Sequence, residues 1–403
     1  MQTKISTEFS QTLAGQRAEE ILRSCVHCGF CTATCPTYQL LGDELDSPRG
    51  RIYLIKQMLE GNDVTRKTQQ HLDRCLTCRS CETTCPSGVQ YSHLLEIGRE
   101  LVDERISRSI VTNAKRWLLR QLLPYPKRFA FILNSARFFR PLLPSALKKS
   151  VPVVLGSTRW SNSTQNRKMI VLDGCVQPAL SPTINAATSR VLSRLGIELI
   201  NITSAQCCGA VNQHMSDSAT ANTFIKNNID QWHPLIESGE AEAIIMTASG
   251  CGAMVKEYGY LLQDDKNYAN KAKAVSTACK DISEVISNED LSIFKPKTDK
   301  SISFHSPCTL NHAQQLNGVV ENILTNIGYR LNVIKDAHLC CGSAGTYSIL
   351  QPQISTQLKT SKLKTLQQNQ PELIATANIG CLHHLASGTN TRVLHWIELL
   401  DQE

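Results

Sequence analysis

The stretch Cys25-Val-His-Cys28-Gly-Phe-Cys31-Thr-Ala-Thr-Cys35-Pro36 decides how the first part of this chain folds. Its spacing is C-x2-C-x2-C-x3-C-P, and the same spacing returns at Cys75, Cys78, Cys81, Cys85 and Pro86. Two intervening residues let consecutive thiolates wrap one face of a compact cluster, and the proline then turns the chain away. The fourth thiolate of each run therefore points elsewhere.

This double run is similar to that of bacterial two-cluster ferredoxins, in which the fourth thiolate of each run reaches across to the other cluster. The resemblance assigns Cys25, Cys28, Cys31 and Cys85 to one [4Fe-4S] cluster. It assigns Cys75, Cys78, Cys81 and Cys35 to a second [4Fe-4S] cluster. Zinc sites also use C-x2-C pairs, but eight cysteines in two copies of the longer run favour iron-sulfur ligation.

Composition sets the wider frame. The chain has 403 residues, 41% hydrophobic and 19% charged, which is typical of globular proteins and argues against disorder. The 17 cysteines form an odd number, and the polar N-terminus resembles no export signal. Because no apolar run is long enough to span a membrane, we expect a cytoplasmic protein with free thiols, either dissolved or lying on the membrane from the cytosolic side.

The segment between the two runs predicts a helix. Ile52, Ile55, Met58 and Leu59 follow helical spacing, so we expect a ferredoxin module of the α-helical type. Ser47-Pro48-Arg49-Gly50 is interpreted as the turn that starts this helix. The alternative is that Arg49 contacts an acidic group.

A basic and aromatic connector follows. Residues 101–150 hold eleven Lys or Arg against two acids, with Trp117, Tyr125 and four phenylalanines interleaved, and prolines cut the segment into short helices. Such a surface suits an anionic membrane leaflet or an acidic partner subunit. The alternative is a linker whose aromatic side chains dock on its own domains. No nucleic-acid reader motif accompanies the charge, so we expect no nucleic-acid binding.

From residue 168 onward the chain repeats itself. Cys175, Cys207-Cys208-Gly209 and Cys251 in the first copy correspond to Cys308, Cys340-Cys341-Gly342 and Cys381 in the second. The offsets are 133 residues for the first two features and 130 for the third. Apolar runs alternate with helical stretches in each copy, which predicts parallel α/β layers.

The cysteines of each copy are expected to converge, because ligands gather beyond the carboxyl ends of parallel strands. The single cysteines end predicted strands, and the adjacent pair follows another strand. Neighbouring cysteines make a strained disulfide but suit metal ligation or redox chemistry. The two sets, Cys175, Cys207, Cys208, Cys251 and Cys308, Cys340, Cys341, Cys381, are therefore candidate ligands of an additional cluster or metal. The alternative is that they are buried structural thiols, the role also expected for Cys279.

Taken together, these motifs resemble the iron-sulfur subunits of bacterial glycolate oxidase. The wider family covers lactate utilisation, anaerobic glycerol-3-phosphate dehydrogenase and heterodisulfide reductase. The segments 25–45, 247–259 and 395–400 look most like the glycolate oxidase subunit. The resemblance implies a complex on the inner face of the bacterial inner membrane, in which flavin-bearing subunits oxidise glycolate to glyoxylate. This subunit would carry the electrons onward, toward a quinone or another membrane acceptor.

The repeats depart from the heterodisulfide reductase pattern at one position. That pattern ends in C-x2-C, whereas this chain has Met254 and His384 at the last position. Disulfide-reducing catalysis by the repeats is thus disfavoured but stays an alternative to electron transfer, as does a scaffold role. Gly250-Cys251-Gly252 lacks the third glycine of a dinucleotide-binding loop, so we expect substrate oxidation to occur on a partner.

The sequence therefore predicts a multidomain α+β protein. An α-helical ferredoxin domain (1–100) is followed by the connector (101–167) and two α/β Cys-Cys-Gly domains (168–295 and 296–403). No catalytic residue is assigned. Four histidines are candidates for an acid, a base or a cluster-tuning group, although a structural role is favoured for each: His305, His312, His338 and His383.

Overall fold

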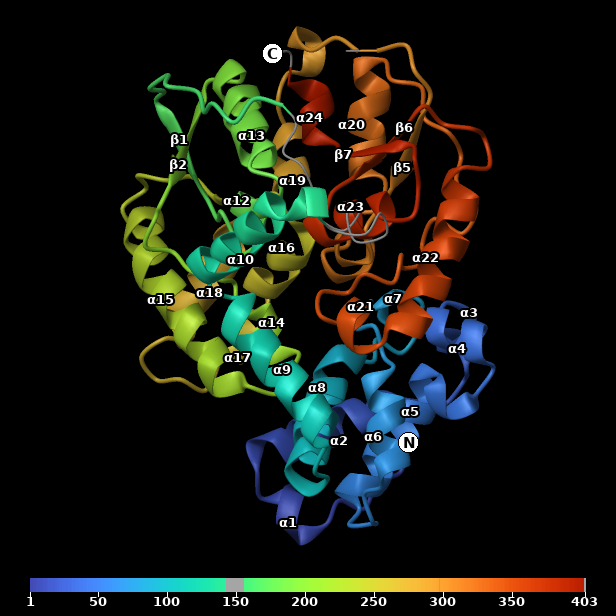
Figure 1. Ribbon diagram of the computed structural model, residues 1–403. Helices are drawn as coiled ribbons and strands as arrows, with labels where there is room; N and C mark the ends of the chain where they lie inside the picture. The colour runs from blue at the N-terminus through green and yellow to red at the C-terminus, as the bar shows by residue number, and fades with distance from the viewer. Residues whose placement is uncertain (143–155, 297, 402–403) are drawn as a thin grey trace. The chain divides into compact units, whose positions relative to one another are not determined.

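The computed structural model describes residues 1–142, 156–296 and 298–401 (Figure 1). The chain divides into two compact units. The first comprises Met1–Arg116 with His338–Lys362, and the second comprises Trp117–Ala337 with Leu363–Glu403. The four-part division expected from the sequence follows the motifs rather than these units and stays a prediction.

The N-terminal part of the first unit is built from helices, and its described residues contain no strand, as expected for an α-helical ferredoxin module. Its elements are α1 (Thr7–Ser10), α2 (Leu13–Ser24), α3 (Phe30–Ala33), α4 (Pro36–Leu41), η1 (Glu44–Asp46), α5 (Pro48–Leu59), α6 (Arg66–Asp73), α7 (Ser80–Thr83) and α8 (Tyr91–Arg105). The later segment of this unit contributes α21 (Tyr347–Leu350) and most of α22 (Pro352–Leu366).

Helix α5 forms where the sequence predicted it. The Ser47 hydroxyl accepts a hydrogen bond from the backbone N–H of Gly50 at 3.0 Å, and Pro48 occupies the first helical position. The side chain of Arg49 also pairs with Glu44 at 2.5 Å, so both interpretations of this turn are realised together. The predicted apolar face is buried in the core of the unit.

Helices α5 and α8 approach each other closely at Gly98. A Cβ atom at this position would lie 2.6 Å from Cγ1 of Ile55, whose side chain is fully buried. The glycine therefore lets two helices that frame the cysteine loops pack without a gap.

We expect Gly98→Ala to destabilise the first unit by about 1–3 kcal/mol, because the new methyl group overpacks a filled core. The melting temperature of the cluster-loaded protein should fall accordingly. In an Ile55→Ala background, which vacates the space, the same change should cost clearly less. Equal costs in both backgrounds would show that the contact between Gly98 and Ile55 does not limit the packing.

The connector forms short helices, as its prolines predicted. They are α9 (Ile110–Leu122), α10 (Pro126–Phe138) and η2 (Arg140–Leu142). Within the second unit, Tyr125 packs edge-on against Phe224, with ring centroids 5.7 Å apart, while Trp117, Phe131, Phe138 and Phe139 are exposed. One aromatic ring of the connector thus packs within the second unit, while other aromatic rings of the connector are exposed to solvent. Pro144, Lys148 and Lys149 lie outside the described residues.

The second unit contains two parallel sheets, which confirms the expected α/β architecture. One sheet has the order β2-β1-β3-β4 and the other the order β5-β6-β7. Its strands are β1 (Arg167–Val171), β2 (Ile197–Asn201), β3 (Ile244–Met246), β4 (Cys279–Asp281), β5 (Ile302–His305), β6 (Leu373–Thr376) and β7 (Arg392–His395).

The topology repeats as the sequence does. β1 pairs with β2 and β3, and β5 correspondingly pairs with β6 and, through one parallel bridge at Ile302, with Leu331. The helices of the first copy are α12 (Gln177–Leu180), α13 (Thr183–Arg194), α14 (Ala210–Gln213), α15 (Ser218–Glu237), α16 (Ser249–Lys256), α17 (Tyr258–Leu261), α18 (Ala269–Ala278), α19 (Ile282–Ile286) and η3 (Leu291–Ile293). Those of the second copy are the π-helix η4 (Thr309–Ala313), α20 (Val319–Ile327), α23 (Ile379–Ala386) and α24 (Ile397–Leu400), besides α21 and α22.

One apolar core joins the two copies. It runs from β1, α13 and β2 to β5, α20, β6 and α24. Beside it, the Arg190 guanidinium on α13 donates to the Asp401 carboxylate through Nε at 3.0 Å, and the Thr183 hydroxyl donates to Glu398 at 2.9 Å. The duplicated halves of this unit are therefore held as one body.

The strands end earlier than the apolar runs suggested, so none of the four single cysteines ends a strand. β1 ends at Val171 and β5 at His305, so Cys175 and Cys308 follow the strands at a distance. β3 ends at Met246 and β6 at Thr376, so Cys251 and Cys381 lie in the first turns of α16 and α23. The apolar run continues into the helix because both segments are buried, and hydropathy alone does not separate them.

His395, at the end of β7, is fully buried, and burial lowers its pKa to about 4. Its Nδ1 accepts a hydrogen bond from the backbone N–H of Ile397 at 3.3 Å. Because the pKa in the folded state lies below the unfolded value of about 6.5, unfolded chains bind the proton first as the pH falls. The wild type should therefore lose roughly 2 kcal/mol between pH 7 and pH 5 through this residue.

We expect His395→Asn, which keeps an acceptor but cannot take up the proton, to lose less stability over that interval. The measurement is the drop in melting temperature from pH 7 to pH 5 in both proteins. An equal drop would show that His395 does not contribute to the acid sensitivity.

Candidate metal centres

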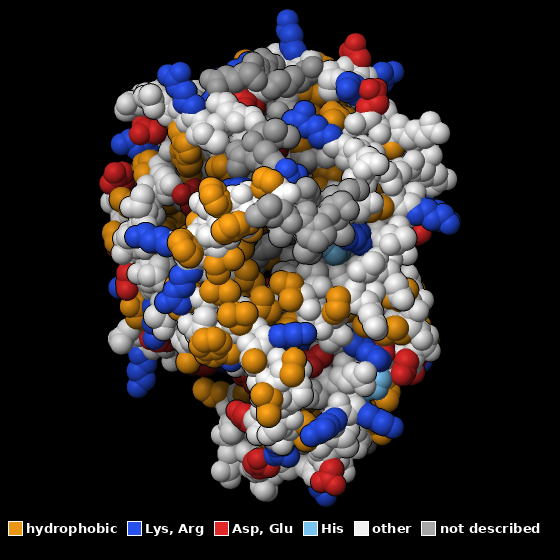
Figure 2. Space-filling model, viewed as in Figure 1, with side chains coloured by type: hydrophobic (Ala, Val, Ile, Leu, Met, Phe, Trp, Pro, Cys, Tyr) orange, Lys and Arg blue, Asp and Glu red, His pale blue; other side chains and the backbone are white. Residues whose placement is uncertain are grey.

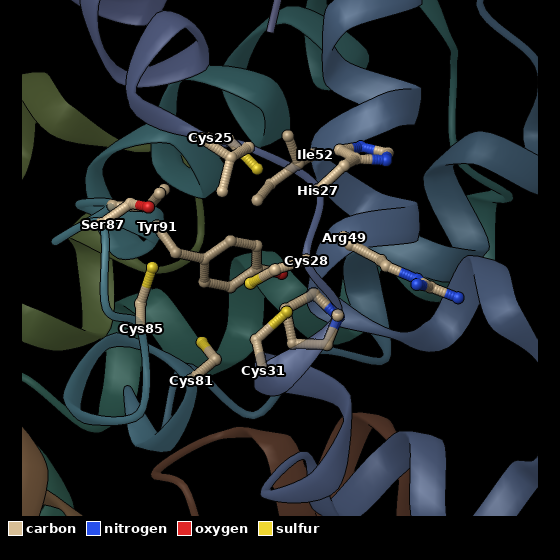
Figure 3. Close-up of a pocket in the computed structure, with 14 residues that line it drawn as sticks. Cys25, His27, Cys28, Cys31, Arg49, Ile52, Cys81, Cys85, Ser87 and Tyr91 are labelled. Atoms are coloured by element: carbon tan, nitrogen blue, oxygen red, sulfur yellow. The ribbon is translucent and has the colours of Figure 1, made fainter.

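Five cysteines from both runs line one cavity in the first unit (Figure 3). They are Cys25, Cys28, Cys31, Cys81 and Cys85. Cys25 follows the end of α2, Cys31 lies on α3, and Cys85 comes just after α7. The predicted first set, Cys25, Cys28, Cys31 and Cys85, is therefore gathered at one place, although Cys85 is distant in sequence.

A second cavity in the same unit is lined by Cys35, Cys75, Cys78 and Cys81. Cys35 precedes Pro36, which begins α4 and turns the chain away from the first cavity. Cys81 lines both cavities, and Tyr91 also borders both. The second set expected from the sequence is thus also brought together, with Cys35 contributed by the first run.

Both cysteine loops use the same backbone turns. His27 and Gly29 have positive φ angles, and so do Thr77 and Arg79 at the equivalent positions of the second run. A left-handed conformation costs a residue with a side chain about 1–2 kcal/mol, and Arg79 is held there while its side chain pairs with Glu82 at 2.6 Å. Because both loops adopt this strained backbone, we infer that the path of each cysteine loop around its cavity is kept for function.

Burial disfavours a free thiolate at one cysteine of each run. Burial, together with the neighbouring Cys25, Cys85 and Cys28, raises the pKa of Cys31 to about 11. Burial likewise raises the pKa of Cys81 well above its usual range. The thiols of Cys31 and Cys81 therefore stay protonated without a metal, and a bound cation would release their protons. This donor set fits a [4Fe-4S] cluster, which supplies one-electron redox chemistry when bound.

Hydrogen bonds reach the sulfurs of the second cavity. The Tyr91 hydroxyl donates to Sγ of Cys75 at 3.5 Å, as does the backbone N–H of Thr77 at 3.5 Å. The Thr37 hydroxyl lies 3.3 Å from Sγ of Cys35. The cysteine spacing indicated neither Thr37, which stands two residues after Cys35, nor Tyr91, which reaches Cys75 from the start of α8.

The four cysteines of the first Cys-Cys-Gly repeat also meet. Cys207 is hydrogen-bonded to Cys175 and to Cys208, which in turn is hydrogen-bonded to Cys251. The thiols of Cys207 and Cys251 lower the pKa of Cys208 well below its usual range, so Cys208 is the thiol that ionises first. This quartet offers four soft ligands around one point.

Buried polar groups fix the Cys207-Cys208 turn. The Asn228 amide donates to the Cys207 carbonyl at 3.0 Å, and the Tyr258 hydroxyl donates to the Cys208 carbonyl at 2.9 Å. Gly209 then takes a φ of 91°, where a side chain would be strained. The turn is therefore held rigidly in place.

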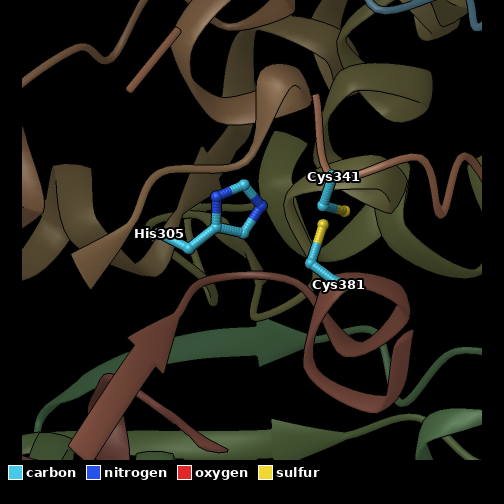
Figure 4. A group of neighbouring side chains, drawn as sticks. All are labelled: His305, Cys341 and Cys381. Carbon is cyan, nitrogen blue, oxygen red and sulfur yellow. The ribbon is translucent and has the colours of Figure 1, made fainter. Parts of the chain in front are cut away.

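The second repeat is divided between the units. Cys308, Cys381 and His305 lie in the second unit, where ligand atoms of His305 and Cys381 come within 4.8 Å of one another (Figure 4). Cys340 and Cys341 lie on the segment His338–Lys362 of the first unit. In that unit the Tyr347 hydroxyl donates to the carbonyl of Arg74 at 2.9 Å, next to Cys75.

The remaining candidate histidines have different surroundings. Nε2 of His383 lies 3.0 Å from the Ser181 hydroxyl, and burial lowers the pKa of this histidine to about 4, which fits the favoured structural role. His312 lies in η4, and His338 begins the segment that joins the first unit. Cys279 is buried in β4, as expected for a structural thiol.

Comparison with known proteins agrees with this arrangement. The family model for a 4Fe-4S dicluster domain matches residues 21–89, and the model for a cysteine-rich domain matches residues 169–256 and 302–386. The glycolate oxidase iron-sulfur subunit of Escherichia coli (strain K12) is 51% identical over 403 residues, covering 100% of this chain and 99% of the relative.

More distant relatives share part or all of this organisation. The probable glycolate oxidase iron-sulfur subunit of Bacillus subtilis (strain 168) is 28% identical, covering 98% of this chain and 96% of the relative. Lactate utilization protein A of Bacillus velezensis is 28% identical over 56% of this chain and 96% of its own length. Since an identity of 51% continues through the dicluster module and both cysteine-rich repeats, this chain belongs to the family of glycolate oxidase iron-sulfur subunits.

Proposed function

We propose that this chain carries electrons through two [4Fe-4S] clusters in a complex that oxidises glycolate to glyoxylate. Flavin-bearing partner subunits would supply the electrons, and a quinone would receive them. The 51% identical relative is a glycolate oxidase iron-sulfur subunit, which supports this substrate. The protein would not oxidise glycolate alone, since Gly250-Cys251-Gly252, its nearest approach to a dinucleotide loop, lies in α16, where the Cys251 thiol is hydrogen-bonded to Cys208.

The observation that carries this proposal is the crosswise sorting of the ferredoxin cysteines. Cys85 reaches the cavity of the first run, and Cys35 reaches the cavity of the second run. Two cavities that share a wall at Cys81 and Tyr91 suit electron transfer between neighbouring clusters. Independent zinc sites would not require each run to donate its last cysteine to the other.

We expect anaerobically purified protein to contain about eight iron atoms and eight labile sulfides per chain if only this module is loaded. Cys85→Ser should weaken or remove the signal of the first cluster, and Cys35→Ser that of the second. Iron analysis and EPR of the reduced variants measure both. Cys279→Ser serves as the control and should keep all the iron.

The opposite pairing would contradict the crosswise assignment: Cys35→Ser would then disturb the cluster of Cys25, Cys28 and Cys31. Iron clearly above about eight per chain would place further metal in the Cys-Cys-Gly repeats. The meeting of Cys175, Cys207, Cys208 and Cys251 supports such a site, whose loss in a Cys207→Ala, Cys208→Ala variant would identify it.

Lactate is the alternative substrate, favoured by the similarity to lactate utilization protein A. Glycerol-3-phosphate, or disulfide reduction at the repeats, are weaker alternatives from the wider family. Reconstitution with the partner subunits distinguishes them, because only the true substrate should reduce the clusters through the complex. Bleaching of the cluster absorption by lactate but not by glycolate would overturn the assigned substrate.

We further propose that the connector places the protein on the inner face of the bacterial inner membrane. No helix among the described residues is both long and apolar enough to cross a bilayer. Within the second unit, the connector presents an exposed, mainly aromatic face (Figure 2). This aromatic face consists of Trp117, Phe131, Phe138 and Phe139 with the aliphatic Leu118 and Ile132. Residues 105–172 contain no Asp or Glu, so the charge around this face complements anionic lipid.

We expect the protein to sediment with vesicles that contain phosphatidylglycerol and much less with purely zwitterionic vesicles. Phe131→Ser with Phe138→Ser, which are 75% and 79% exposed, should reduce that binding severalfold. Val333→Ser, at an apolar position 89% exposed outside the connector, is the matched control. Unchanged vesicle binding together with lost binding of a partner subunit would show that the aromatic face docks a protein instead.

A further inference from the structure

A buried guanidinium lines the second cysteine cavity. Arg51, on α5, is only 1% exposed and borders the same space as Cys35, Cys75, Cys78 and Cys81. A fully buried arginine is rare unless it is paired, and this one lies among groups that become negative when they bind metal. The sequence analysis assigned no role to Arg51.

Arg51 is fixed by hydrogen bonds on every side. Nε donates to the carbonyl of His71 at 2.7 Å, and both terminal nitrogens donate to the Thr37 hydroxyl at 3.2 Å. Nη2 also lies 3.4 Å from the Asp46 carboxylate, which is shared with Arg74 at 2.8 Å and with His71 at 3.0 Å. This geometry holds the positive charge at one place beside the cavity.

Thr37 connects the guanidinium to a cysteine. Its hydroxyl oxygen accepts from Arg51, and its single proton has two acceptors within reach, the Asp46 carbonyl at 3.2 Å and Sγ of Cys35 at 3.3 Å. A metal-bound Cys35 has no proton to give, so Thr37 is then the donor of this contact. Donation from Arg51 polarises the hydroxyl toward the sulfur.

The charge of Arg51 is retained despite burial. Burial alone would lower its pKa, but the surrounding acidic groups, Cys75, Tyr91, Cys35 and the Asp46 carboxylate, raise the pKa above the usual arginine range, and a guanidinium keeps its proton in proteins. The Asp46 carboxylate is divided among three partners, so it does not cancel the guanidinium charge that faces the sulfurs.

The first cavity has no equivalent arrangement among its described lining residues. Its arginine, Arg49, is 37% exposed and pairs with Glu44, and Cys28 at the same cavity is also exposed. Water therefore screens the Arg49 charge, whereas the charge of Arg51 acts through a medium of low dielectric constant. The two neighbouring arginines of one helix turn thus differ in their electrostatic effect.

We propose that Arg51 is a positioning residue that raises the reduction potential of the second cluster, acting by its charge and through the Thr37 hydroxyl on Cys35. The inference rests on the proposed second cluster at Cys35, Cys75, Cys78 and Cys81. Reduction there adds one negative charge, which a fixed buried cation favours, and hydrogen bonds to the sulfurs act in the same direction.

The test is a potentiometric titration of the whole chain, followed by EPR, after iron and sulfide analysis has shown that both clusters are present. Arg51→Met should lower the potential of the second cluster by at least the equivalent of a tenfold change in its reduction equilibrium, about 59 mV for one electron. Arg51→Lys, which keeps the charge, should shift it less. Arg49→Met is the matched control and should leave that potential unchanged.

Thr37→Val keeps the guanidinium and the side-chain shape but removes the hydroxyl, so it should lower the same potential by a smaller amount. If Arg51→Met fails to load iron, the potential measured in Thr37→Val tests the inference instead. Loaded Arg51→Met and Thr37→Val proteins with the wild-type potential, or equal shifts in the Lys and Met variants, would overturn the inference. A wild type without a second cluster would instead refute the proposed function.

Discussion

The structure depends on one constraint: each ferredoxin run must supply its last cysteine to the cavity of the other. Cys35 can reach the second cavity only if Pro36 turns the chain into α4, and Cys85 must return to the first cavity after α7. Paired left-handed turns at both loops, and the close packing of α5 on α8 at Gly98, hold the two runs in this relation. The helices thus bring together sulfurs that are up to 60 residues apart in the sequence.

Much of this arrangement could be predicted because it follows from the spacing of residues along the sequence. The cysteine runs, the apolar face of α5 and the offsets of the duplicated repeat are all regular patterns in the sequence. The polar environment of the second cavity could not be predicted in the same way, since Arg51, Thr37, Asp46 and Tyr91 meet only after folding. Hydropathy also failed to separate the ends of β3 and β6 from α16 and α23, because both kinds of segment are buried.

The duplicated repeats show how one sequence pattern yields two environments. In the first repeat, four thiols form one hydrogen-bonded set whose backbone is fixed by Asn228 and Tyr258. In the second, the Cys340-Cys341 segment belongs to the helical unit, and Tyr347 ties it to the carbonyl that precedes Cys75. The internal offsets gave no sign of this difference, which depends on the segment His338–Lys362 belonging to the helical unit. On this account, a Cys-Cys-Gly turn and the second cluster share one structural unit.

The central claim is that two clusters lie side by side in the crosswise cavities of residues 25–85. The most direct measurement is EPR of the fully reduced protein, recorded with power saturation and integrated against a spin standard. The account predicts about two spins per chain, with the line broadening that magnetic coupling between neighbouring clusters produces. One narrow, uncoupled signal of a single spin, or none in protein that restores activity to its partner subunits, would contradict it.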